Sequence, residues 1–145
     1  INQTSESFGS QCIVAAVDVL RKSVGEGQPS EWEIYINGGR KPTGINAIEW
    51  IQELVYRGAG ELVLNSIDAD GTRDGYDIEF NLKASEKVNV PIVASGGAGN
   101  MDHIHEVLTN GRASAALAAS IFHYQEHTIP EVKQFLKDRG VSIRL

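Results

Sequence analysis

Short apolar segments alternate with segments of helical spacing along this chain, and this alternation constrains the fold more than any other feature. The apolar, strand-like segments are 12–17, 61–65, 91–94 and 113–120. The segments with apolar residues three or four positions apart are 45–57, 78–88, 100–111 and 128–140. Strands that alternate with helices pair in parallel and are joined by helical crossovers. The sequence therefore predicts an α/β fold of four βα units around a parallel sheet.

The segment between the first strand and the first helix departs from this alternation. Residues 21–31 are polar, and over 32–36 apolar residues alternate with polar ones before a glycine pair at 38–39. Such a pattern is typical of a short hairpin. We expect Trp32 and Tyr35 to pack within this excursion.

Two helix starts carry capping signals. Asn100 precedes one helical segment, and Thr128 precedes another with Glu131 three residues later. Thr and Glu at this spacing form a capping box, which satisfies main-chain N–H groups at a helix start. We therefore expect helices to begin directly after Asn100 and Thr128.

Composition argues against several classes of protein. The chain has 145 residues, 41% of them hydrophobic, and a formal net charge of −6. This suffices for one domain with a core, and no apolar run approaches the roughly 18 residues of a membrane-spanning helix. Without a Lys/Arg block, we expect no nucleic-acid partner.

The sole cysteine, Cys12, lies in an apolar segment, where we expect it to be buried. A single cysteine forms no internal disulfide, which fits a reducing compartment. Residues 1–10 are polar and carry no secretory signal. We therefore expect a cytoplasmic protein without a membrane partner.

A glycine cluster, Gly96, Gly97 and Gly99 in the stretch VASGGAGNMD, lies where the third strand meets its helix. The dinucleotide motif G-x-G-x-x-G fails here, because its third glycine would fall on Asp102. Either the glycines only turn the chain, or they expose bare backbone for an anion. Phosphate sites of α/β barrels combine such a loop with a short helix start after the next strand. The stretch AASIF after the fourth strand supplies that second part and favours the anion site.

Several longer stretches resemble one family. They are FGSQCIVAAVD, GGRKPTG, RGAGELVLNSIDADGTRDGYD, VASGGAGNMDH and AALAASIFH. Together they resemble the carboxyl half of the cyclase subunit of imidazole glycerol phosphate synthase, from about Phe8 to Leu145. The resemblance implies half of a TIM (β/α)₈ barrel. It also implies a reaction without a cofactor, in which ammonia from a glutaminase partner splits and cyclises a phosphoribulosyl-formimino-aminoimidazole carboxamide ribotide. The products would be imidazole glycerol phosphate and aminoimidazole carboxamide ribotide, with one substrate phosphate bound by each half of the barrel.

The same resemblance assigns roles to residues. Asp18 would be one of two catalytic aspartates, an acid/base for the proton transfers; its alternative role is capping at a strand end. The residues that would hold phosphate or the polar middle of the substrate are Asn65, Asp70, Gly71, Ser95, Gly96, Gly97, Ala119 and Ser120. Their alternative is ordinary turn chemistry and strand-end capping. Gln11 and Glu61 would lie at the opposite mouth, which docks the glutaminase and admits ammonia, or they are solvated strand-start residues.

Other features of the sequence bear on a metal site and on alternative functions. His123 and His127 are four residues apart, but no third ligand is apparent, so we expect no metal. The family commonly has Ala-Lys where Val19-Leu20 stands, and often Thr where Asn65 stands. These departures leave open a paralogue that uses ammonia in a surface-sugar pathway. The sister isomerase of the histidine pathway and a non-catalytic phosphate-binding half-barrel also remain open.

The chain carries half of what a barrel requires. A complete barrel has eight strands and about 250 residues, whereas we expect a single half-barrel domain over 1–145, with open edges at 12–17 and 113–118. Open apolar edges pair or aggregate, and the chain begins at Ile1 rather than Met. We expect a fragment or a split subunit, closed by an amino-terminal half-barrel or by a second copy. Alone it should bind phosphate and turn over little substrate.

Overall fold

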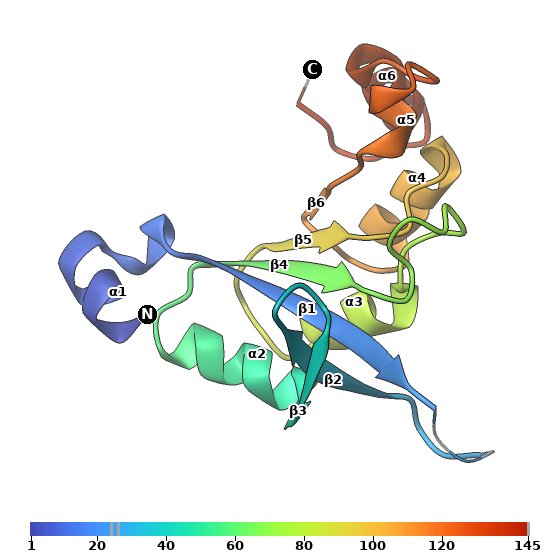
Figure 1. The fold of residues 1–145 in the computed structure, drawn as a ribbon. Helices are drawn as coiled ribbons and strands as arrows, with labels where there is room; N and C mark the ends of the chain where they lie inside the picture. Colours follow the sequence, from blue (N-terminus) through green and yellow to red (C-terminus); the bar gives the residue numbers. More distant parts are fainter. Residues whose placement is uncertain (24, 26, 145) are drawn as a thin grey trace.

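A single sheet organises the chain, with helices packed on one of its faces (Figure 1). The computed structural model describes residues 1–23, 25 and 27–144, so two residues of the polar stretch 21–31, and residue 145, lie outside the described part. The strands are β1 (Val14–Lys22), β2 (Glu31–Ile36), β3 (Lys41–Asn46), β4 (Glu61–Ser66), β5 (Ile92–Ser95) and β6 (Ala115–Ala116). The helices are α1 (Asn2–Phe8), the 3₁₀ turn η1 (Ser10–Cys12), α2 (Ala47–Tyr56), α3 (Ile78–Ser85), α4 (Met101–Thr109), α5 (Ser120–His123) and α6 (Ile129–Asp138).

The strand order is β3-β2-β1-β4-β5-β6. Strands β1, β4, β5 and β6 pair in parallel, while β2 and β3 form an antiparallel hairpin on the edge of β1. The four parallel strands with their following helices form half of a TIM barrel, as the alternation predicts. The hairpin expected around Trp32 is confirmed, and it adds two antiparallel strands to that sheet.

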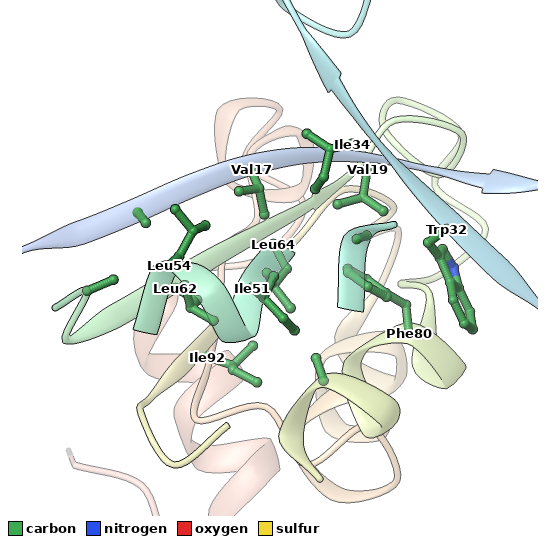
Figure 2. Close-up of a cluster of buried hydrophobic side chains, with 14 residues drawn as sticks. Val17, Val19, Trp32, Ile34, Ile51, Leu54, Leu62, Leu64, Phe80 and Ile92 are labelled. Atoms are coloured by element: carbon green, nitrogen blue, oxygen red, sulfur yellow. The ribbon is translucent and has the colours of Figure 1, made fainter. Parts of the chain in front are cut away.

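Alternate residues of the parallel strands form the core. Val17, Leu62 and Leu64 point from β1 and β4 toward Ile51 of α2, where Figure 2 shows them packed together. Trp32 of the hairpin is 2% exposed and stacks against Phe80 of α3, with ring centroids 5.4 Å apart. These contacts fix α2 and α3 on one face of the sheet, to which the hairpin contributes two strands.

The other face of the parallel sheet is uncovered within the described part of the chain. Residues on this face alternate with the core residues: in β1 Ala15 and Val17 are buried, whereas Val14 and Ala16 are exposed. Val14 is 54% exposed, and Leu117, which follows β6, is 48% exposed. We call the face that carries Val14, Ala16, Val63, Val93 and Ala115 the open sheet face. In a closed barrel, the corresponding face fills the interior.

The capping predictions are confirmed. The Asn100 side chain accepts a hydrogen bond from the main-chain N–H of His103, and α4 begins at Met101, directly after Asn100. Thr128 and Glu131 form the capping box at the start of α6. These local signals fix helix starts because main-chain donors in a first turn have no partner within the helix.

Several boundaries differ from the prediction. Cys12 is exposed in η1 rather than buried in a strand, and β1 begins only at Val14. The fourth strand is confined to Ala115–Ala116, because the chain leaves the ladder and turns into α5 at Ser120. α3 ends at Ser85, before the expected end at 88.

The hairpin pairs with β1 beyond the segment 12–17, whose edge we expected to be open. The ladder with β2 covers β1 from Asp18 to Lys22. Among the described residues, 14–17 pair only with β4, and β6 forms the other edge of the sheet. Within the described part of the chain, the free edge expected at residues 12–17 therefore remains along 14–17, and the hairpin covers only the extension of β1 over residues 18–22.

Candidate functional site

Three polar side chains join across neighbouring strands at the carboxyl end of the sheet. Asp18, Asn65 and Ser95 occupy paired register positions on β1, β4 and β5. Asn65 Nδ2 donates to Asp18 Oδ1 at 3.0 Å, and Ser95 Oγ donates to Asn65 Oδ1 at 3.1 Å. We call this the polar chain. It fixes the orientation of the Asn65 amide, because one end donates and the other accepts.

The sequence suggested that the first strand ends at Asp18, but the strand continues beyond it. β1 continues to Lys22 because residues 18–22 pair with β2. Asp18 nevertheless stands level with the end of β4 and β5, since its register partner is Asn65. Its side chain therefore reaches the carboxyl end of the parallel strands, where ligands bind in α/β barrels.

A hollow of about 130 Å³ lies beside the polar chain. It is lined by Asp70, Gly71, Arg73, Ser95, Gly96, Gly97, Ala98, Leu117, Ala118, Ala119 and Ser120. Seven predicted binding residues thus come together in one place, and the eighth, Asn65, reaches it through Ser95. The hollow and the polar chain share Ser95, which makes them one continuous candidate site.

The glycine cluster has a packing role as well as a turn role. Gly97 has φ +104°, and a Cβ there would overlap the carbonyl oxygen of Gly75. A Cβ at Gly99 would overlap the carbonyl oxygen of Arg73. Gly75 N–H also donates to the carbonyl of Gly97 at 2.8 Å. The close approach that the cluster permits is therefore that of the loop after β4, residues 67–77, which forms the opposite wall of the hollow.

Main-chain donors at the hollow are available. Within residues 1–23, 25 and 27–144, the N–H groups of Gly71, Gly97 and Ser120 find no hydrogen-bond acceptor. Gly71 has φ +78° and open space where a Cβ would stand. Free main-chain N–H groups on small residues are the donors that phosphate oxygens accept from in such loops.

Arg73 is a lining residue that sequence reasoning missed. Its guanidinium Nη2 donates to the carbonyl of Gly99 at 3.3 Å and forms an ion pair with Glu126. It has φ +67°, unusual for a residue with a Cβ. A basic residue two positions after the Asp70-Gly71 pair is the only sequence signal that could have found it.

Tyr76 ties the loop after β4 to the fourth strand. Its hydroxyl donates to the carbonyl of Leu117 at 2.8 Å. Burial raises the pKa of the Tyr76 phenol, so the hydroxyl keeps its proton and remains a donor. This bond holds two walls of the hollow together.

Gln11 and Glu61 lie at the other end of the strands. Glu61 begins β4, as predicted, and pairs with Val14 at the start of β1. Gln11 stands in η1 rather than in a strand, with its main chain against Gly60. The structure therefore brings these two residues near each other and keeps them apart from the hollow.

A second polar cluster anchors the hairpin. The Arg21 guanidinium donates to Asp77 and Glu79, and Trp32 Nε1 donates to Asp77 Oδ2 at 2.8 Å. The hydrogen bond from Arg21 lowers the pKa of Glu79 to about 2, with smaller contributions from Lys83 and Ser30, against a desolvation effect that raises it. We call Arg21, Asp77, Glu79 and Trp32 the hairpin clamp. It joins β1 and β2 to the start of α3.

Within the described residues, no group of three or more His, Cys, Asp or Glu side chains is arranged to hold a metal ion. No helix in that part of the chain has the length and apolar character needed to cross a bilayer.

The fold and the candidate site define an α/β half-barrel with polar groups and small residues at the carboxyl ends of its parallel strands. Residues 1–128 match the family model described as histidine biosynthesis protein. The chain therefore belongs to the histidine biosynthesis protein family, whose members include enzymes of that pathway. The resemblance noted from the sequence is confirmed at this level.

Proposed function

We propose that this chain forms the carboxyl-terminal half of the cyclase subunit of imidazole glycerol phosphate synthase. The observation that carries the proposal is the continuity between the polar chain and the hollow. Asp18 is linked through Asn65 to Ser95, and Ser95 lines the hollow that has free main-chain donors. A phosphate held in the hollow would thus place the rest of a bound substrate along the polar chain toward a carboxylate that can move protons.

In this proposal the hollow binds one of the two phosphates of the ribotide substrate. The N–H groups of Gly71, Gly97 and Ser120 donate to its oxygens, since they find no acceptor among the described residues. Small residues leave room for the anion to approach the main chain closely. Asp70 lines the same hollow and lies next to these donors.

Asp18 acts as the acid/base of this half. Addition of ammonia, ring closure and elimination each move a proton, and a positioned carboxylate accelerates such steps by about 10²–10⁴-fold. The Asn65 amide holds Asp18 from one side and is held by Ser95 from the other. The polar middle of the substrate would meet Asn65 and Ser95 between the phosphate and Asp18.

Two partners follow from the proposal. An amino-terminal half-barrel, or a second copy, covers the open sheet face and supplies the second aspartate and the second phosphate site. A glutaminase docks at the opposite end of the strands, where Gln11 and Glu61 lie, and ammonia passes from there toward Asp18. The apolar side chains exposed on the open sheet face support the first partner, because such a face is stable only when covered.

The test is an assay of this chain together with an amino-terminal half-barrel of the cyclase family. We expect cleavage and cyclisation of the ribotide that require added ammonium, and little turnover by either half alone. Isomerisation of the precursor aminoaldose without ammonium would instead identify the sister isomerase. Phosphate binding without any turnover would identify a non-catalytic module. Ammonium-dependent turnover of another phosphorylated sugar, with none of the ribotide, would identify the surface-sugar paralogue.

A further inference from the structure

We propose that Arg73 is a side-chain ligand of the phosphate in the hollow, and that Glu126 competes with the phosphate for it. This inference rests on the proposed function in one respect, that the hollow binds a phosphate. It adds a charged residue, and a means of regulating its availability, to a site otherwise built from main-chain donors.

The position of Arg73 supports the first half of the proposal. Arg73 lines the hollow together with Gly71 and Gly97. Among the described groups, only its Nη2 has partners, the carbonyl of Gly99 and the carboxylate of Glu126. A guanidinium carries five N–H donors in a fixed plane. Its Nε and Nη1 donors therefore remain available for a phosphate oxygen.

The charges at the hollow favour such a cation. Asp70 also lines it, so a bound dianion would face a carboxylate as well as the main-chain donors. Arg73 is the sole cationic side chain among the residues that line the hollow. A guanidinium offsets that repulsion and forms paired hydrogen bonds with phosphate oxygens.

The ion pair with Glu126 supports the second half. The side chains of Arg73 and Glu126 are 41% and 35% exposed, so their attraction is screened by water and weak. A phosphate ester carries a charge of about −1.5 to −2 at neutral pH, more than the single charge of Glu126. The anion would therefore draw the guanidinium away from Glu126, and Glu126 would reduce the affinity for phosphate by occupying it.

The experiment is a calorimetric titration of the full chain with inorganic phosphate at constant ionic strength. Arg73→Gln should weaken binding by about tenfold, the effect of one charge-assisted hydrogen bond at a partly exposed site. Glu126→Gln should tighten binding by about two- to fivefold, the effect of releasing a weak ion pair. In the double variant, Glu126→Gln should have almost no effect, because the guanidinium it releases is absent.

Matched controls come from another exposed pair. Arg57 and Glu53 form an ion pair at the end of α2, and neither residue lines the hollow. Arg57→Gln and Glu53→Gln change the net charge equally and should leave the phosphate affinity unchanged.

The possible outcomes separate this inference from the proposed function. If the wild type binds phosphate and Arg73→Gln binds it equally well, Arg73 is no ligand and the phosphate site stands without it. If Glu126→Gln weakens binding, or tightens it equally in the double variant, Glu126 does not compete through Arg73. If the wild type binds no phosphate, both the proposed phosphate site and this inference are wrong.

Discussion

Glycine residues at the candidate site have two different structural roles, and single substitutions should distinguish these roles. Gly97 has a positive φ and no room for a Cβ, because the carbonyl of Gly75 occupies that space. Gly71 also has a positive φ, but nothing lies within 4 Å of a Cβ there. Gly97 therefore serves the packing of two loops, whereas Gly71 serves only the backbone conformation and the access to its N–H.

We predict that Gly97→Ala destabilises the chain much more than Gly71→Ala. Gly71→Ala should cost about 1–2 kcal/mol, the strain of a left-handed residue with a Cβ. Gly97→Ala adds a collision with main chain and should cost at least about 3 kcal/mol. Urea unfolding of both variants measures the difference. Equal losses would show that the loop after β4 does not press on Gly97.

Among single residues, the sequence predicted most of those that line the hollow but missed Arg73. Gly96, Gly97 and the Asp70-Gly71 pair carry turn signals that can be read locally. Arg73 belongs to the site only because the loop after β4 folds back over the glycine cluster, and no local pattern encodes that contact. The burial predicted for Cys12 was wrong because an apolar run does not reveal that its first residues form the 3₁₀ turn before β1.

Among the elements, the β2–β3 hairpin is held by a polar clamp as well as by apolar packing. Arg21 bridges Asp77 and Glu79 at the start of α3, and Trp32 reaches the same Asp77. Trp32 also stacks on Phe80. The hairpin was predicted from alternation and a glycine pair, but the clamp joins residues more than forty positions apart and could not be.

We predict that the clamp weakens in acid. The pKa of Glu79 is lowered from 4.5 to about 2 in the folded chain. A lowered folded-state pKa means that the ionised group stabilises the fold above pH about 4.5 and that this contribution is lost as the pH falls toward about 2. Because the Glu79 side chain is 42% exposed, the contribution should stay below about 1 kcal/mol.

The measurement is urea unfolding of the wild type and Glu79→Gln between pH 6 and the onset of acid unfolding. The stability difference between the two should shrink as the pH falls. A difference that stays constant over this interval would show that Glu79 contributes no charge interaction to the clamp.

For the whole molecule, the open sheet face is the feature that most strongly indicates a partner. Helices α2 and α3 cover one face (Figure 1). Apolar residues such as Val14 remain exposed on the other. The alternation of strands and helices predicted the half-barrel. It did not predict the short β6 or the partial cover of the β1 edge, because both depend on how the ends of the sheet are paired.

We predict that a charge on the open sheet face impairs assembly without unfolding the chain. Val14→Glu should change the free energy of unfolding by no more than about 0.5 kcal/mol, because Val14 is already 54% exposed. It should weaken association with an amino-terminal half-barrel at least about tenfold, since the charge would be buried there. Tyr56→Glu is the matched control, as Tyr56 is 86% exposed on α2. Equal association of both variants would show that this face is not the interface.

We propose that Asp18 moves protons on a substrate whose phosphate is held by the loops after β4, β5 and β6. The most direct test compares the wild type with Asp18→Asn, each combined with an amino-terminal half-barrel, for ammonium-dependent turnover and for affinity toward inorganic phosphate. We predict that turnover falls at least about a hundredfold, while the phosphate affinity changes by about twofold or less because the main-chain donors are intact. Undiminished turnover in Asp18→Asn would show that Asp18 is not the acid/base, and so would an equal loss of phosphate binding and turnover in a variant that remains folded.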